Sequence, residues 1–236
     1  MISVCMATYN GAKYIESQLL SVISQLSSTD EVIISDDHST DGTLSIIQSL
    51  HDSRIKIFQG PCKKNPKFNF ENALKHAKGD IIFLCDQDDI WEPNKVEVMV
   101  SALSDCDLVT SDCHVVDSDL NIISNYYAWL KPANGFLNNL WKTHFLGCCM
   151  AFKAKILKET LPFPKTVEMH DMWIGLYAAL NYKTKFINDR LIKYRRHGNN
   201  VSSSSGPSNR SIFYMIYYRL NMCRLVLVRT MINKLL

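Results

Sequence analysis

The sequence lacks several patterns that would assign it to other classes of protein. Its eight cysteines form no C-x-x-C pair, so the spacings typical of zinc sites and thioredoxin-like redox motifs are absent. No charge-free apolar stretch approaches the roughly 18 residues that span a bilayer. The start, MISVCMATYN, predicts a strand and lacks the basic and apolar regions of a signal peptide. We therefore expect reduced core cysteines and a cytoplasmic location.

Acidic residues are missing from the last part of the chain. Residues 190–236 hold nine Lys and Arg and no Asp or Glu, whereas residues 1–189 hold 17 basic and 23 acidic residues. The net charge of +3 hides this asymmetry. The two parts are therefore expected to meet different surroundings.

Short apolar runs alternate with helical patterns over the first 104 residues. Strands are predicted at 2–7, 31–35, 55–58 and 80–85, and amphipathic helices at 14–26, 43–51, 69–77 and 94–103. Buried runs separated by helices are typical of parallel βαβ units. This pattern favours a nucleotide-binding α/β fold, in which ligands bind beyond the carboxyl ends of the strands.

The second half of the chain is less regular. Strands are predicted at 108–116, at 147–152 and in the first part of 185–198, and helices from 153 and at 169–181. An aromatic-rich connection covers 121–145, and a Ser- and Gly-containing linker covers 199–209.

The C-terminal segment predicts a helix with arginines in an unusual pattern. Arg219, Arg224 and Arg229 recur every five residues, so they are expected to spread around the helix. This spacing predicts neither a clean amphipathic face nor a transmembrane span. Two alternatives stay open: packing on the domain or a partner, and peripheral contact of 210–236 with anionic lipid.

Polar segments follow three of the predicted strands: TYN (8–10), SDDHSTDG (35–42) and DQDD (86–89). In a parallel sheet these segments meet at one edge and can form one site. A sugar nucleotide suits such a site. Asp37 could accept from the N3–H of uracil or thymine, Tyr9 could stack on the base, and Asp88 could hold a cation that bridges the phosphates.

Three carboxylates are crowded into FLCDQDDIW: Asp86, Asp88 and Asp89. Two carboxylates about 4 Å apart repel by roughly 4 kcal/mol at an effective dielectric constant near 20. Bound Mg²⁺ or Mn²⁺ would relieve this repulsion, because both prefer oxygen ligands. Asp86 and Asp88 are the predicted ligands, with Asp89 in a supporting role. The alternative for DQDD alone is a solvated loop.

Six segments in order resemble one family: SVCMATYNG, VIISDDHSTDGT, KGDIIFLCDQDDIWEPNK, GCCMAF, HDMW and YRRHGNNVS. Over residues 2–203 the chain is similar to family 2 glycosyltransferases of the GT-A fold, and most of all to bacterial rhamnosyltransferase-like enzymes of surface polysaccharide assembly. The sequence departs from the family at His38, which replaces a glycine, and in NPKFNF, which lacks one.

The resemblance implies roles for individual residues. Thr8, Tyr9, Asn10 and Asp37 would lie at the nucleobase, with Lys67 as a basic residue near the donor. Asp86 and Asp88 would form the D-x-D pair, with Asp88 as direct metal ligand. His197 corresponds to a histidine that binds the metal or the diphosphate, and Asp171 to the catalytic base.

Residues around HDMW and YRRHG also suggest chemistry by themselves. Asp171 opens a helix, where the amide dipoles favour its charge, although a helix cap is the alternative. Trp173 fits either a sugar platform or the core, and His170 is expected to be a neutral neighbour. Arg195 and Arg196 would attract a diphosphate. Cys148 and Cys149 are predicted to be packing residues.

Together these patterns predict a GT-A catalytic domain at 1–203 with a mainly parallel sheet. It divides into a nucleotide-binding half (1–104) and an acceptor half (105–203), followed by a linker and basic helix (204–236). The predicted function is metal-dependent inverting transfer from a UDP- or dTDP-sugar to a glycan or lipid-linked glycan, at the inner face of the membrane. The alternatives are a nucleotidyltransferase and a non-catalytic scaffold of the same fold.

Overall fold

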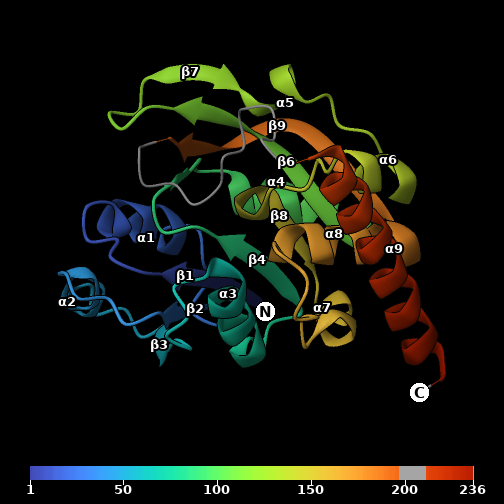
Figure 1. The fold of residues 1–236 in the computed structure, drawn as a ribbon. Coiled ribbons are helices and arrows are strands. Elements are labelled where there is room, and N and C mark those ends of the chain that lie inside the picture. The colour runs from blue at the N-terminus through green and yellow to red at the C-terminus, as the bar shows by residue number, and fades with distance from the viewer. Residues whose placement is uncertain (197–210, 236) are drawn as a thin grey trace.

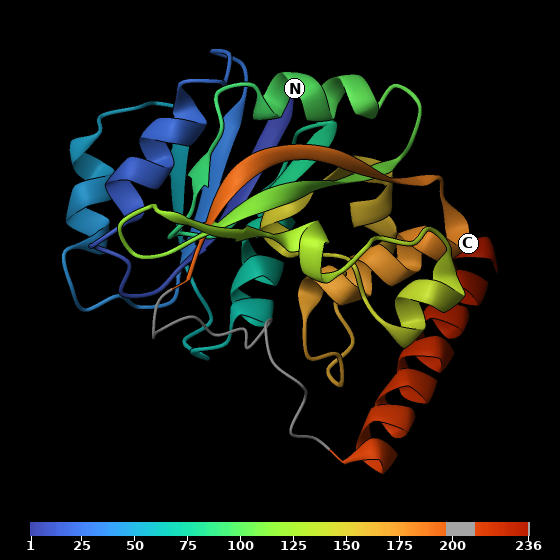
Figure 2. The same cartoon turned by 90° about the horizontal axis from the view of Figure 1, so that it is seen from above.

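A computed structural model describes residues 1–196 and 211–235 of the chain. These residues form one nine-stranded sheet flanked by helices (Figures 1 and 2). Eight strands follow one another across it in this order: β3 (Ile55–Gln59), β2 (Glu31–Asp36), β1 (Ile2–Thr8), β4 (Ile81–Cys85), β8 (Met150–Lys153), β6 (Leu108–Val116), β9 (Thr184–Arg195) and β5 (Ile90–Trp91). The remaining strand, β7 (Ile122–Asn125), pairs with β6.

Parallel pairing dominates the first half of the chain. β3, β2, β1 and β4 all run parallel, as the alternation of strands and helices predicts. In the second half β6 and β9 pair in parallel, and antiparallel pairs enter with β5, β7 and β8. The carboxyl ends of β1, β2 and β4 therefore share one edge of the sheet.

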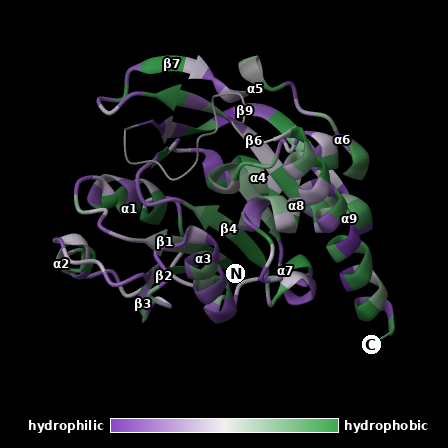
Figure 3. Ribbon diagram, in the orientation of Figure 1, coloured by the Kyte–Doolittle hydropathy of each residue, from purple (hydrophilic) through white to green (hydrophobic). Residues whose placement is uncertain are grey.

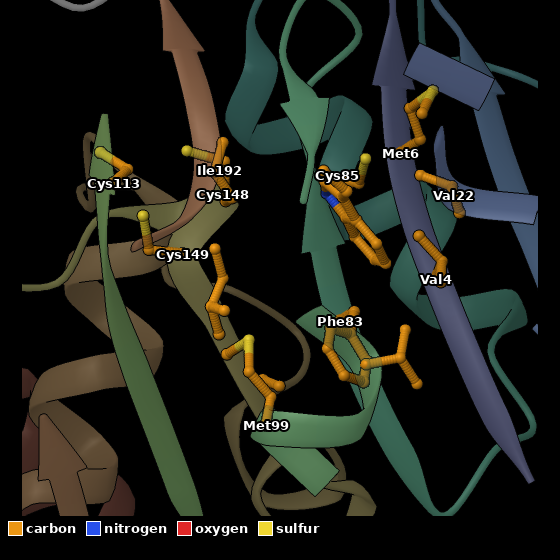
Figure 4. Close-up of a cluster of buried hydrophobic side chains, with 14 of the residues drawn as sticks. Val4, Met6, Val22, Phe83, Cys85, Met99, Cys113, Cys148, Cys149 and Ile192 are labelled. Carbon is orange, nitrogen blue, oxygen red and sulfur yellow. The ribbon is translucent and has the colours of Figure 1, made fainter. Parts of the chain in front are cut away.

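Alternate residues of each strand enter two hydrophobic clusters, one on each face of the sheet. Val4 and Met6 point to one cluster and Cys5 to the other. The first cluster, part of which is drawn in Figure 4, contains residues of α1 (Ile15–Ile23), α2 (Thr43–Ser49) and α4 (Lys95–Ala102). The second contains residues of α3 (Pro66–His76), α7 (Ala154–Thr160), α8 (His170–Asn181) and α9 (Ile212–Leu235).

The middle of the chain differs from the prediction in two places. Residues 147–149, predicted as strand, form the 3-10 helix η1 (Gly147–Cys149) before β8 begins. The connection at 121–145 contains β7 and two short helices, α5 (Tyr126–Trp129) and α6 (Phe136–Trp141). Among the described residues, no helix is both long enough and apolar enough to cross a bilayer.

The cysteines are free, and six of the eight are buried. Cys62 is exposed and Cys223 is half-buried, so the prediction of core cysteines is wrong for these two. Cys62 lies in the loop before α3, where the polar run PCKKN offers no apolar neighbour to cover it.

Candidate active site

The strand register brings three predicted motifs together. Thr8 of β1 is level with Asp36 of β2, and Met6 of β1 is level with Cys85 at the end of β4. Tyr9, Asp37 and Asp86 therefore leave the sheet side by side, each directly after the last residue of its strand. The predicted meeting of the three segments at one edge is confirmed.

Thr8 and Asn10 brace the loop that follows β2. The buried Thr8 Oγ1 donates to Asp36 Oδ2 at 2.8 Å. Asn10 has a φ of 48°, and its Oδ1 accepts from the backbone N–H of Thr40 at 2.8 Å. Both side chains thus hold the loop after β2 in place. Their place beside a nucleobase stays a prediction.

Asp37 binds the backbone of the loop before α3 at the same edge of the sheet. The carboxylate is buried, and its oxygens accept from the backbone N–H groups of Lys63 at 3.2 Å and Lys64 at 2.5 Å. The Lys64 ammonium in turn lies 5.5 Å from the centroid of the Tyr9 ring. This corner offers an aromatic face and a cation, which are suited to a base and a phosphate respectively.

The loop after β4 holds its carboxylates in two environments. Asp86 and Asp88 are half-buried, whereas Asp89 is fully buried and its Oδ1 accepts from the backbone N–H of Arg195 at 2.9 Å. Burial, followed by the negative charges of Asp88 and Asp171, raises the pKa of Asp86 to about 8. The ionised form of Asp86 is therefore disfavoured until positive charge arrives.

The same loop fits a divalent cation. Among the described residues, the buried Asp89 Oδ2 has no hydrogen-bond partner. Ligand atoms of Asp86, Asp89 and Cys148 lie within 4.8 Å of one another. Clustered carboxylate oxygens are the ligands that Mg²⁺ and Mn²⁺ prefer. The cluster thus joins Asp86 to Asp89 and Cys148, neither of which was predicted as a ligand, and it does not include Asp88, whose place as direct metal ligand stays a prediction.

Arg195 holds the acidic loop in place through hydrogen bonds. It is buried, and its Nε donates to the carbonyl of Asp88 at 2.8 Å. One terminal nitrogen donates to the carbonyl of Ser118 at 2.5 Å, and the guanidinium lies 4.4 Å from the centroid of the Tyr14 ring. Through these contacts Arg195 connects β9 to the acidic loop and to the turn after β6.

Arg196 directly follows the last residue of β9. It is half-buried, and its backbone N–H donates to the carbonyl of Val116 at 2.8 Å. The attraction of a diphosphate by Arg195 and Arg196 stays a prediction. His197 lies outside the described residues.

Asp171 is the second residue of α8, and its carboxylate is held in place by two amides. Oδ2 accepts from the N–H of Gly147 at 3.1 Å and Oδ1 from the N–H of Met172 at 2.7 Å. The cap of this helix is Met169, so the alternative of Asp171 as the cap is wrong. Gly147 directly precedes Cys148, whose sulfur lies within 4.8 Å of ligand atoms of Asp86 and Asp89, so Asp171 lies near the acidic loop.

Lys67 is bound to the segment that leads to α8. Its Nζ is buried and donates to the carbonyls of Lys165 at 2.9 Å and Val167 at 2.8 Å. Burial lowers the pKa of Lys67. The observed contacts position the 165–167 segment, while the predicted contact of Lys67 with a donor stays a prediction.

Two neighbours of Asp171, Trp173 and His170, are packed in the protein interior. Trp173 is fully buried and its Nε1 donates to the carbonyl of Thr160 at 3.0 Å, so it belongs to the core. His170 is buried and stacks on Phe70 with a centroid separation of 4.0 Å. Burial lowers the pKa of His170, which keeps the ring neutral, as predicted.

Gln87 was not predicted to contribute to the site. Its side chain projects from the acidic loop and forms hydrogen bonds with the backbone of Tyr9. Its place between Asp86 and Asp88 was the available signal, but a glutamine there fits a solvated loop equally well.

The sequence as a whole matches a known family. The family model described as Glycosyl transferase family 2 matches residues 3–161. The chain belongs to glycosyl transferase family 2. This glycosyltransferase is 28% identical over 209 residues to UDP-Glc:alpha-D-GlcNAc-diphosphoundecaprenol beta-1,3-glucosyltransferase WfgD of Escherichia coli, and the match covers 86% of this chain and 80% of WfgD.

Solved structures show that the glycosyltransferase has the GT-A fold. S. aureus TarS 1–349 in complex with UDP-GlcNAc matches with a TM-score of 0.70 and 21% identity, over 97% of this chain and 66% of that chain. Glucosyl-3-phosphoglycerate synthase from Mycobacterium tuberculosis, in complex with Mn²⁺, UDP and glucosyl-3-phosphoglycerate, matches with a TM-score of 0.60 and 18% identity, over 97% of this chain and 79% of that chain. The chain thus spans about two thirds of the TarS chain.

Proposed function

We propose that this protein is a metal-dependent inverting glycosyltransferase that moves a hexose or deoxyhexose from a UDP- or dTDP-sugar to a hydroxyl group of a growing surface glycan. The observation that carries the proposal is the closeness of Asp171 to the acidic loop, which contributes to raising the pKa of Asp86 to about 8. A base opposite the group that holds the diphosphate is what inverting transfer requires.

In this mechanism Asp171 accepts the proton of the acceptor hydroxyl as its oxygen attacks the anomeric carbon. The new carbon–oxygen bond forms on the face opposite the nucleoside diphosphate, and the bond to the diphosphate oxygen breaks with its electron pair. The N–H groups of Gly147 and Met172 orient the carboxylate, and the start of α8 favours its ionised form.

Asp86 and Asp88, with Asp89 in support, are the residues that would hold Mg²⁺ or Mn²⁺. When bound, the cation supplies Lewis-acid stabilisation of the leaving diphosphate. The presence of Mn²⁺ and UDP in the complex of the mycobacterial synthase supports this assignment. We expect removal of the metal with EDTA to abolish turnover and added Mn²⁺ or Mg²⁺ to restore it.

The names of relatives guide the choice of donor and acceptor. WfgD is described as acting with UDP-Glc on a sugar linked to diphosphoundecaprenol, and TarS was solved with UDP-GlcNAc. UDP-hexoses are therefore the first donors to test, with dTDP-deoxyhexoses second. We propose that the acceptor is lipid-linked and that segment 210–236 holds the enzyme at the inner face of the membrane.

The deciding experiment measures the product released from each donor in the presence of a lipid-linked acceptor extract. Release of a nucleoside diphosphate supports sugar transfer, release of pyrophosphate indicates a nucleotidyltransferase, and no turnover with any donor indicates a scaffold. Asp171→Asn should lower the turnover number by roughly 10²–10⁴-fold. Glu16→Gln, which changes an exposed acidic residue in the first turn of α1, is the matched control and should leave turnover unchanged.

A further inference from the structure

The arginines of α9 spread around the helix, as their five-residue spacing predicts, so each meets different surroundings. Arg229 turns toward the domain, where its terminal nitrogens donate to the carbonyls of Glu159 at 3.0 Å, Leu161 at 2.9 Å and Pro162 at 2.7 Å. Arg219 donates from Nε to the carbonyl of Trp141 at 2.9 Å. Arg229 and Arg219 are thereby bound to residues outside α9, whereas Arg224 is exposed and donates to Asn221 Oδ1 of the same helix at 3.1 Å.

This arrangement leaves an apolar stripe on the outside of α9. The inner face of the helix buries Met222, Val226 and Thr230. Residues three or four positions apart share a helix face. The exposed apolar side chains that follow this spacing on the opposite face are Phe213, Tyr217, Leu220, Leu227, Met231 and Leu235, which we call the outer stripe, and the exposed Arg224 lies among them between Leu220 and Leu227. Figure 3 shows hydrophobic residues recurring along α9 up to its C-terminal end.

A second short helix enlarges this exposed apolar surface. α6 lies beside α9 (Figure 1). The guanidinium of Arg219 lies 5.1 Å from the centroid of the Trp141 ring. Trp141 and Leu137 of α6 are both exposed. Indole rings are favoured at the boundary between a bilayer and water.

The charge around the outer stripe suits an anionic surface. Residues 190–236 contain no acidic residue, and Arg224 and Lys234 of α9 are exposed, as is Lys142 after α6. Long basic side chains can rest on an apolar surface while their charges reach lipid headgroups. A second copy fits less well, because a two-fold pairing of α9 with itself would bring together helices that carry only positive charge.

The N-terminal half of α9 is also tied to the segment just before the proposed base. The Tyr214 hydroxyl donates to the carboxylate of Glu168, and the Tyr218 hydroxyl accepts from the Glu168 N–H at 3.3 Å. Asn221 Nδ2 donates to Thr166 Oγ1 at 3.3 Å. A partner surface that binds α9 would therefore lie near the start of α8, which contains Asp171.

We propose that the outer stripe, together with Leu137 and Trp141, is a docking surface for an anionic lipid bilayer, and that docking presents a lipid-linked acceptor to Asp171. The docking itself stands on the exposed apolar and basic residues, whereas the delivery of an acceptor rests on the proposed function.

Vesicle flotation tests the docking. The full chain should float with vesicles of phosphatidylglycerol and phosphatidylcholine, and at least ten-fold less with phosphatidylcholine alone. The triple change Phe213→Ser, Leu220→Ser and Met231→Ser should reduce binding to anionic vesicles at least ten-fold. The control is the double change Ile122→Ser and Ile123→Ser on β7, since these side chains (60% and 58% exposed) match Leu220 and Met231 (both 66%).

The outcomes separate the possible occupants of this surface. The proposal would be overturned if the triple variant floated as well as the wild type. It would also be overturned if the wild type did not float with anionic vesicles. A wild-type dimer in solution that becomes monomeric in the triple variant, without vesicle binding in either, would assign the surface to a second copy. Unchanged circular dichroism and melting temperature verify that the triple variant is folded.

Activity separates docking from the proposed function. The triple variant should keep wild-type turnover on a water-soluble acceptor and lose at least ten-fold on the same acceptor linked to lipid in vesicles. If the wild type floats but releases no nucleoside diphosphate from any donor, docking stands and the proposed function fails. Equal losses on both acceptors would show that the stripe does not act through the membrane.

Discussion

The side-chain amide of Gln87 pairs with the backbone of Tyr9 through two hydrogen bonds. Gln87 Oε1 accepts from the Tyr9 N–H at 2.9 Å, and Nε2 donates to the Tyr9 carbonyl at 3.1 Å. This pairing joins the loop after β1 to the acidic loop after β4. The distance between the ring of Tyr9 and the carboxylates is therefore set by one glutamine.

We expect Gln87→Ala to weaken nucleotide binding about 10-fold, because two hydrogen bonds worth about 1 kcal/mol each would no longer fix the two loops. Titration calorimetry with UDP measures the affinity. Gly11→Ala should reproduce the defect, since a Cβ there would lie 2.4 Å from Gln87 Oε1. Gln48→Ala, an exposed position in α2, is the control. Normal UDP affinity in both site variants would show that the loops are placed independently.

The raised pKa of Asp86 predicts a pH-dependent stability of the metal-free protein. With a folded pKa of about 8 against an ordinary value of 3.8, the folded state holds a proton that the unfolded chain has released at intermediate pH. The stability contributed by this group is therefore complete below about pH 4 and is lost as the pH rises to about 8.

Asp86→Asn should reduce this dependence, and the part that remains comes from Asp89, whose pKa burial also raises. Urea unfolding in EDTA should show a fall in the unfolding free energy from about pH 5 to about pH 8 that is smaller in the variant by roughly 1–3 kcal/mol, less than the full shift because the half-buried side chain is screened. Asp119→Asn, at an exposed carboxyl, should behave like the wild type. Identical pH profiles for all three proteins would contradict the assignment.

Metal binding should release a proton from the same carboxyl. A cation needs the ionised form of Asp86, so the affinity for Mn²⁺ should increase with pH up to about 8 and then level off. Calorimetry in buffers of different ionisation enthalpy counts the protons released. Asp86→Asn should bind Mn²⁺ more weakly and release fewer protons. An affinity that does not change with pH would argue against Asp86 as a ligand.

Substitution of Lys67 distinguishes a role in positioning the 165–167 segment from direct contact with the donor. Lys67→Met removes two charge-assisted hydrogen bonds to the 165–167 segment and should lower the unfolding free energy by about 1–3 kcal/mol. It should also lower kcat, because this segment leads to Asp171, with UDP affinity unchanged. Lys63→Met, at an exposed lysine of the neighbouring loop, is the control. Weaker UDP binding with full stability would instead support the predicted contact of Lys67 with the donor.

The order of elements in the first half of the fold could be predicted because burial leaves a local pattern in the sequence. The strand predicted at 31–35 is found at Glu31–Asp36, and both faces of it are covered. The helix predicted from residue 69 begins at Pro66, because Asn65 caps it by accepting from the N–H of Lys67 at 3.0 Å. The polar segments at the strand ends then followed from parallel pairing.

Side-chain direction and long-range pairing could not be predicted in the same way. The hydrogen bond from Arg195 to the carbonyl of Asp88, for example, leaves no trace in the local sequence, because the two residues are 107 positions apart. The thiol of Cys148 lies beside Asp89 only because β8 pairs with β4 and β6, which local periodicity does not encode. Arg229 of α9 turns inward for a similar reason, since the carbonyls that it binds belong to residues 159–162, far from it in the sequence.

The loop whose backbone binds Asp37 contains an exposed thiol that can be labelled. Cys62 is exposed and directly precedes Lys63, whose N–H donates to Asp37, whereas six of the other thiols are buried and Cys223 is half-buried on α9. A maleimide dye should therefore attach first at Cys62, within a few residues of the corner formed by Tyr9 and Lys64. The sequence thus offers a place for a fluorescent reporter at this corner, and a change of its signal on addition of UDP-sugars would test the proposed donor site in real time.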